Sequence, residues 1–147
     1  MPGERAALRS FVALAGLLTA TSCSSQGSAQ QTLSFAAQPD MVETGMNDAL
    51  RVAVRASPDP PWQGTIAVAL SVTNTSDGSP VDGLTVTMVP WMPAHGHGTS
   101  LTPVVTAEGG GKYLVTDVDL FMAGYWALQT SFSGPTADYV APGYNVP

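Results

Sequence analysis

Two histidines, the only two in the 147-residue chain, stand two positions apart in the segment PWMPAHGHG at residues 90–98. In an extended segment the side chains at i and i+2 point to the same side, so His95 and His97 could offer two imidazoles to one ion. Met92 would add a thioether, and Met88 and Met122 would join it if their strands are neighbours. Imidazole with thioether favours copper, Cu(I) above all, over zinc or the hard cations. We therefore expect a copper site at this segment.

The same segment also fits a purely structural interpretation. His95 and His97 would then bond to backbone carbonyls in a tight loop, Trp91 would be buried, and the methionines would fill gaps in the core. The protein would then be an interaction module without a metal, whose sandwich binds another envelope protein through its edges or loops. A His-x-His pair is a weak motif, and the spacing leaves both interpretations open.

Composition and motifs exclude several other functions. The formal net charge is −6, with ten acidic against three basic residues after Cys23, and such a surface repels a phosphate backbone. The chain has no nucleophile motif, phosphate loop or dinucleotide fingerprint. We expect neither nucleic-acid binding nor enzymatic activity, and we assign no catalytic residue.

Alternating apolar and polar residues predict the elements that position the histidines. Six short strands with turn residues between them, and no helical segment, indicate an all-β antiparallel sandwich of about six to seven strands over residues 49–134. In the fifth strand, Tyr113 and Val115 compete with Leu114, Val118 and Leu120 for the buried face, so its phase stays open. The expected strands cover residues 50–55, 65–73, 84–88, 101–107, 112–120 and 125–132. Residues 135–147 are expected to form a loose or packed-down extension.

The amino-terminal residues predict export and membrane attachment. Residues 1–22 have a weakly basic start and an apolar run at 11–20, which is typical of a signal peptide and short for a membrane span. Ala20-Thr21-Ser22-Cys23 resembles the lipobox of bacterial lipoproteins, although Ala20 stands where Leu is usual. Cys23 is the only cysteine, and lipidation would explain a lone exported thiol; the alternative is an ordinary signal peptide that leaves Cys23 incidental.

This anchor would set the arrangement of the mature protein. Residues 23–48 would be the lipidated cysteine, a polar tether and a lead-in arm or first edge strand, on the outside of the cell membrane or on an outer membrane. An acylated terminus would also exclude a copper site built on a free terminal amine.

Three blocks of sequence, in order, resemble the YtkA-like domain family. They are Met92-Pro93-Ala94-His95-Gly96-His97-Gly98, Gly111-Lys112-Tyr113, and the run from Phe121 to Leu128 with Met122, Gly124 and Trp126. The resemblance covers about residues 50–134 and implies an immunoglobulin-like sandwich in an exported or membrane-attached bacterial protein. It also implies partners in metal handling or in cytochrome oxidase assembly. Ala94 stands where some relatives carry Met, which removes one soft donor.

Overall fold

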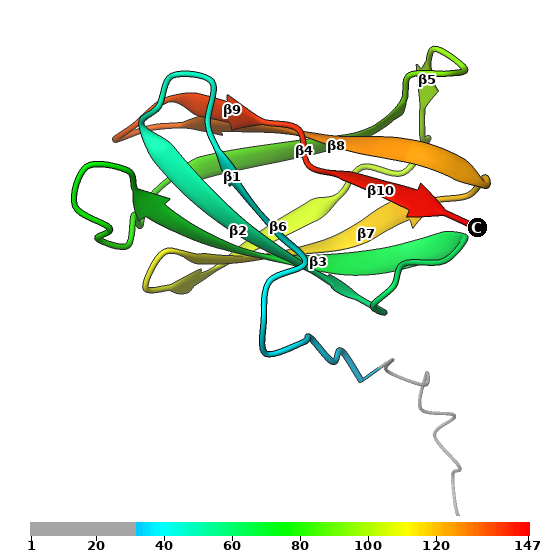
Figure 1. Cartoon of the computed structure of the whole chain (residues 1–147), viewed down its shortest axis with the longest axis horizontal. Coiled ribbons are helices and arrows are strands. Elements are labelled where there is room, and N and C mark those ends of the chain that lie inside the picture. Colours follow the sequence, from blue (N-terminus) through cyan, green and yellow to red (C-terminus); the bar gives the residue numbers. More distant parts are fainter. Residues whose placement is uncertain (1–31) are drawn as a thin grey trace, which may run out of the picture. The chain divides into compact units, whose positions relative to one another are not determined.

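The computed structural model describes residues 32–147, which form one compact unit of two β-sheets packed face to face (Figure 1). The predicted signal peptide, Cys23 and most of the tether lie outside the described residues. No helix in the described part is long and apolar enough to cross a membrane. The antiparallel sandwich expected from the alternation is confirmed, with ten strands between Met41 and Val146.

The first sheet has the order β1-β2-β3-β7-β6, and every neighbouring pair is antiparallel. Its edge strand is β1. Residues 23–48 were expected to contain either a lead-in arm or a first edge strand, and β1 confirms the edge strand. The predicted strand at 101–107 begins later, as β6, because Pro103 has no N–H to donate to a ladder. The strands are β1 (Met41–Thr44), β2 (Leu50–Ser57), β3 (Gly64–Asn74), β6 (Val104–Gly109) and β7 (Lys112–Leu120).

The second sheet has the order β10-β8-β4-β5, and β9 also pairs with β8. Residues 135–147 are therefore no loose extension, because two strands of this segment continue the sheet along β8 and bury Val140, Tyr144 and Val146. The strands are β4 (Thr85–Met92), β5 (His97–Gly98), β8 (Gly124–Ser133), β9 (Asp138–Val140) and β10 (Gly143–Val146).

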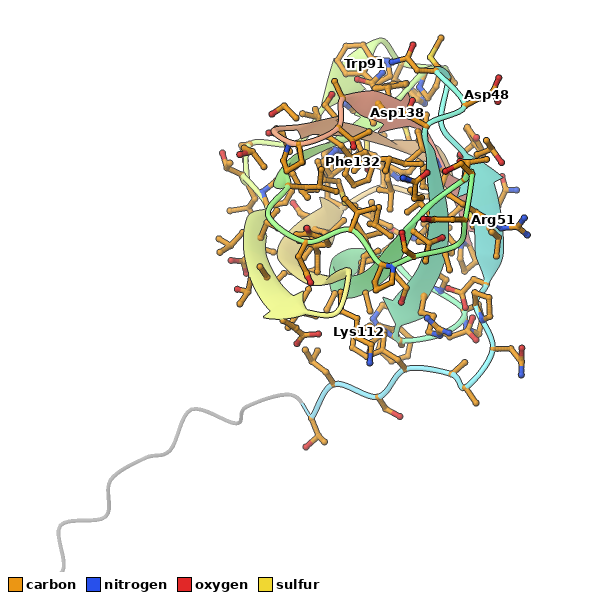
Figure 2. The ribbon with its side chains drawn as sticks, turned by 90° about the vertical axis from the view of Figure 1, so that its left-hand side faces the viewer. Asp48, Arg51, Trp91, Lys112, Phe132 and Asp138 are labelled. Carbon is orange, nitrogen blue, oxygen red and sulfur yellow. The ribbon has the colours of Figure 1, made fainter. Side chains whose placement is uncertain are left out.

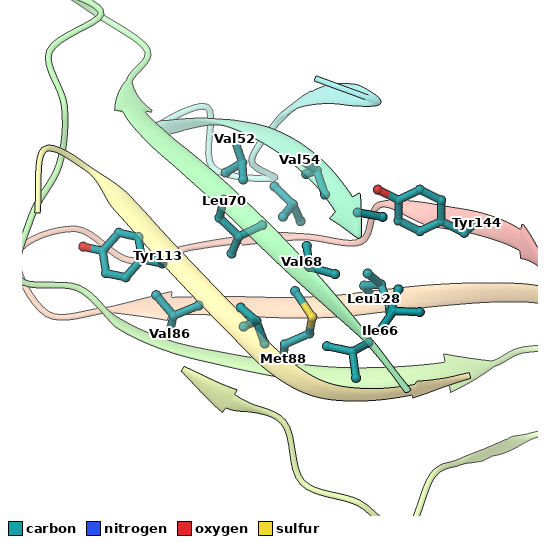
Figure 3. Close-up of a cluster of buried hydrophobic side chains, with 14 of the residues drawn as sticks. Val52, Val54, Ile66, Val68, Leu70, Val86, Met88, Tyr113, Leu128 and Tyr144 are labelled. Atoms are coloured by element: carbon teal, nitrogen blue, oxygen red, sulfur yellow. The ribbon is translucent and has the colours of Figure 1, made fainter. Parts of the chain in front are cut away.

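The core lies between the two sheets and consists of the inward-facing residues of both (Figure 3). The clearest predicted strand is confirmed, since Ile66, Val68, Leu70 and Val72 of β3 are all buried. Trp126, Leu128 and Phe132 of β8 meet them from the other sheet. The described strands and core side chains all lie within residues 41–147, so both sheets and the core between them belong to this one unit.

A bulge in β7 resolves the phase that the sequence left open. Asp117 has φ +57°, and the register of β7 against β3 shifts between the pairs at Ile66 and Val68. An extra residue at a bulge moves the following side chains to the other face. Tyr113 and Val115 are therefore buried before the bulge, and Val118 and Leu120 after it.

Asp138 ties the carboxyl-terminal strands to the start of β2 (Figure 2). Asp138 is 5 % exposed, and its carboxylate accepts hydrogen bonds from four backbone amides: Asn47 at 2.9 Å, Ala49 at 3.1 Å, Leu50 at 2.9 Å and Tyr139 at 2.8 Å. Burial raises the pKa of this carboxyl, but the four amides outweigh burial and hold the pKa below its usual range. Asp138 is therefore ionised near neutral pH.

Candidate functional site

The two histidines lie on the hairpin between β4 and β5, at the end of the sandwich where β7 turns into β8 (Figure 1). The carbonyl of Met92 accepts the amides of His95 at 3.1 Å and Gly96 at 2.9 Å. Gly96 has φ +66°, a conformation that closes the turn and that glycine adopts without strain. His95 therefore lies in a turn, and the expectation of an extended His-Gly-His segment is wrong.

The turn nevertheless brings the two imidazoles together. Their ring centroids are 5.7 Å apart, with the planes inclined at 45°. His95 is exposed, whereas His97 is half-buried. The pair therefore presents one solvent-facing ring beside one ring that the protein holds.

His97 is held by two aromatic rings and one hydrogen bond. It stacks on Phe121 at a centroid distance of 5.7 Å and an angle of 22°, and meets Trp126 nearly edge-on at 6.3 Å. Its Nδ1 lies 3.0 Å from the carbonyl oxygen of Gly98. Because a carbonyl can only accept, Nδ1 carries the proton in this bond, and Nε2 of the neutral ring keeps its lone pair for another partner.

The β7–β8 turn supplies the residues on which the His97 ring packs. Trp126 is fully buried, and its indole Nε1 donates to the carbonyl of Met122 at 2.9 Å. Gly124 has φ +129°, and a Cβ at this position would lie 3.1 Å from the terminal methyl of Met92. Gly124 thus lets the hairpin and the turn pack closely, which supports the structural role expected of Trp126 and Gly124.

The three candidate methionines are in different places. Met122 is half-buried in the turn next to Phe121, and Met92 is only 1 % exposed, in the core below the hairpin. Met88 is buried in the middle of the core, four residues before Met92, which is about 13 Å along a strand. The structure brings Met92 and Met122 to the histidine end of the sandwich and does not bring Met88 there.

The distance between the two imidazoles matches what one shared ion would require. With a metal–nitrogen distance of about 2.0 Å, two imidazoles on one ion have centroids up to roughly 6 Å apart, so the observed separation allows a shared ion. The described residues contain no group of three or more His, Cys, Asp or Glu suited to a metal. The structure brings two thioethers, Met92 and Met122, to the same end of the sandwich, and a set of imidazoles with a thioether is one that would suit Cu(I).

The structural interpretation of the hairpin receives partial support. His97 does bond to a backbone carbonyl, as that interpretation expected. Trp91, by contrast, is only half-buried on the outer face of β4 (Figure 2). Neither feature accounts for the exposed ring of His95.

The second sequence block, Gly111-Lys112-Tyr113, lies at the opposite end of the sandwich. The Tyr113 hydroxyl donates to the Val81 carbonyl at 2.9 Å and accepts the Leu84 amide at 3.1 Å. The Gly111 amide donates to Asp82 at 2.9 Å. This block therefore fixes the crossing from β3 to β4 and takes no part in the histidine site.

Sequence reasoning missed Phe121 as a member of the site. The signal was present, since Phe121 directly precedes Met122 in the third block and is 45 % exposed for a large apolar ring. Its role depends on the hairpin lying over the β7–β8 turn, and strand alternation does not predict that contact.

Comparison with known proteins agrees with this architecture. The family model described as YtkA-like matches residues 44–131. The crystal structure of a DUF4426 family protein from Pseudomonas aeruginosa PAO1 is similar, with a TM-score of 0.50 and 12 % identity, over 73 % of this chain and 96 % of that one. At this identity the similarity supports the fold alone. None of the curated proteins compared matches the chain.

Proposed function

Because this chain belongs to the YtkA-like family, we propose that it is an exported lipoprotein that binds copper as cargo. Cys23 would carry the lipid, and the β4–β5 hairpin would bind the ion, Cu(I) in preference. Chaperone, buffer and sensor roles all fit a site that holds one ion at the membrane surface.

The geometry of His97 carries this proposal. Its Nδ1–H donates to the Gly98 carbonyl, so the lone pair on Nε2 is free to bind an ion. In many metal sites the ligating histidine is oriented in the same way, by a hydrogen bond from its other ring nitrogen. The stack on Phe121 fixes the ring plane. A ring oriented in this way binds an ion without first losing rotational freedom.

His95 and Met122 would complete the set. His95 lies on the solvent side, 5.7 Å from His97 between centroids, where an incoming donor protein or chelator can reach the ion. Met122 is half-buried at the same end of the sandwich and would supply the thioether. A site with one exposed ligand, His95, and two half-buried ligands, His97 and Met122, would suit an ion that is transferred to another protein.

Competition for Cu(I) tests the site. Residues 24–147 are titrated with Cu(I) under reducing conditions against a chromophoric chelator, alongside His95→Ala, His97→Ala and Met122→Leu. We expect either histidine variant to weaken Cu(I) binding at least a hundredfold, since loss of one strong ligand from three costs about 3 kcal/mol or more, and Met122→Leu to weaken it about tenfold.

Two methionine variants are matched controls. Met46→Leu changes a thioether that is 78 % exposed and distant from the hairpin, and Met88→Leu changes the buried one that is not brought to it. Both are expected to bind Cu(I) like the unaltered protein. Equal binding by the His95→Ala and His97→Ala variants and the unaltered protein would disprove the copper proposal.

The anchor has its own test in cells. Cys23→Ser is expected to abolish palmitate labelling and to move the full chain from the detergent phase to the aqueous phase. Unchanged partitioning would disprove lipidation at Cys23 and leave the copper proposal standing. Partners in metal handling or oxidase assembly, which the family resemblance implies, would be sought by crosslinking the anchored protein in intact cells.

A further inference from the structure

The strand β4 has a free edge along most of its length. Its second neighbour, β5, pairs only with Trp91 and Met92, whereas β8 pairs with residues 85–91 on the other side. Among the described strands, none pairs with Val86–Pro90 on the β5 side. An unpaired edge of this kind is a template for another extended chain.

The backbone groups on this edge can be assigned from the hairpin. The Met92 carbonyl accepts the amides of the β4–β5 turn and so points away from β8. Polar groups of a strand alternate between its two sides, and residues two and four positions apart therefore point the same way. Val86 and Met88 direct both N–H and C=O to the free edge, and Pro90 directs only its carbonyl.

A groove of about 380 Å³ runs beside this edge. One wall is residues 86–90 of β4, and the other is the segment that crosses from β5 to β6, with Leu101, Pro103 and Val105. The hydroxyl of Thr99, which begins that segment, donates to Asp119 at 3.2 Å and ties it to β7. No charged residue lines the groove.

Apolar side chains remain exposed around the groove. Leu101 is 46 % exposed and Val89 45 %, and both line the groove. The edge also lacks the lysines and other charges with which proteins commonly prevent strand addition. Only Pro90 interrupts the row of donors.

We infer that the free edge of β4 binds an extended peptide segment with uncharged, largely apolar side chains, which adds to the sheet as a further strand. Backbone donors and acceptors at Val86 and Met88 would bond to the peptide, and the uncharged groove would take every second side chain, as in other complexes formed by strand addition. An acyl chain could fill the groove but would leave these amides without partners. This inference is independent of the copper proposal.

Nuclear magnetic resonance with a model peptide tests the inference. The probe is acetyl-Thr-Val-Thr-Val-Thr-amide, which is uncharged and matches the span of the free edge, added to isotope-labelled residues 24–147. We expect it to shift the amide signals of Val86 and Met88 and to slow their hydrogen exchange at least tenfold. A peptide of the same sequence with N-methylated amides cannot donate and is expected to bind at least tenfold more weakly.

A pair of surface variants provides the matched control. Leu101→Asp places a charge at the groove, while Val42→Asp makes the same kind of change at β1, where Val42 is 43 % exposed. The first is expected to weaken peptide binding at least tenfold, and the second to leave it unchanged. Each variant is first checked for a native spectrum.

Three results would overturn the inference. One is the absence of peptide binding at millimolar concentration. Another is binding without protection of the Val86 and Met88 amides, which would indicate a simple apolar contact such as an acyl chain makes. The third is concentration-dependent dimerisation that Leu101→Asp abolishes, which would show that a second copy of this chain occupies the edge.

Discussion

Replacing Asp138 with alanine removes one acceptor from four backbone amides at once. Three of these amides precede or begin β2, and the fourth, that of Tyr139, lies within β9. The Leu50 residue is fully buried, so water cannot replace the lost bond at its amide without opening the fold. The variant therefore destabilises the junction between the two sheets.

The size of this effect follows from the bonds that are lost. A hydrogen bond to a charged group contributes about 1.5–3 kcal/mol, but four bonds to one carboxylate are not additive. We expect Asp138→Ala to lower the free energy of unfolding by about 3–5 kcal/mol, as for loss of one partner in a buried charged network. With a denaturant slope of about 2 kcal/mol per molar, the midpoint in urea falls by about 2 M.

Asp138→Asn separates charge from shape in the same assay. The asparagine keeps one oxygen acceptor, while its NH₂ group faces two amides that also donate, so we expect a smaller loss of about 2 kcal/mol. Asp77→Ala is the control, because Asp77 bonds only to Ser79 in its own exposed turn and should leave the midpoint nearly unchanged. Equal losses for Asp138→Ala and Asp77→Ala would refute the reasoning.

The same carboxylate makes stability depend on pH. Because the four amides hold the pKa of Asp138 below its unfolded value of about 3.9, its contribution is fully present above that pH and is lost as the pH falls through the folded pKa. The difference in unfolding free energy between the unaltered protein and Asp138→Asn should be constant above about pH 5 and shrink below about pH 4. A difference that stays constant down to pH 2 would contradict this.

Three further changes have defined outcomes. Gly45→Ala would place a Cβ against the Asp138 carboxylate, so its destabilisation in urea should largely disappear when tested on an Asp138→Ala background. Tyr113→Phe removes two hydrogen bonds and should lower the free energy of unfolding by about 1–3 kcal/mol without changing Cu(I) affinity; a change in affinity would place this end of the sandwich in the site. Trp126→Phe loses the bond to the Met122 carbonyl and leaves a void in the core, so it should lower the free energy of unfolding by about 2–3 kcal/mol and also reduce Cu(I) affinity in the chelator competition. An effect on stability alone would remove the turn from the copper site.

The sequence predicts a strand well where its alternation is uninterrupted. In β3, every second residue from Ile66 to Val72 is apolar, and the structure buries each of them. In β7 the alternation fails because Asp117 adds one residue at a bulge, and a single extra residue exchanges the two faces. Only the pairing with β3 reveals that both halves of the ambiguous pattern are buried.

The carboxyl-terminal strands could not be predicted in this way. β9 has three residues and β10 four, with Pro142 between them, and runs that short carry little periodic signal. Their position depends on β8, which offers a free edge, and on Asp138, which binds amides about 90 positions earlier in the chain. A lone acidic residue in a proline-rich tail gives no sign of such a partner.

The position of the candidate site could be predicted from the sequence, but the contacts that support its side chains could not. Two histidines in a glycine-rich segment mark the hairpin directly. Met88 was a candidate on the condition that its strand lies beside the histidine segment. The structure places it on β4 with Met92, where both side chains point inward and the length of the strand separates them. Proximity between strands cannot be deduced from residue types alone.

The structural and metal interpretations of the hairpin now divide between its two histidines. His97 contacts Phe121 and Trp126, and aromatic contacts of this kind contribute about 0.5–1.5 kcal/mol, so it has a role in the fold whether or not an ion binds. His95 is exposed, and among the described contacts its ring meets only His97. A purely structural loop would not need an imidazole at this exposed position. A soft ion bound to Nε2 of His97 would need a second ligand there, and His95 would supply it. The copper proposal therefore depends on both rings: on the half-buried His97, whose Nε2 keeps its lone pair, and on the exposed His95, which the fold itself does not require.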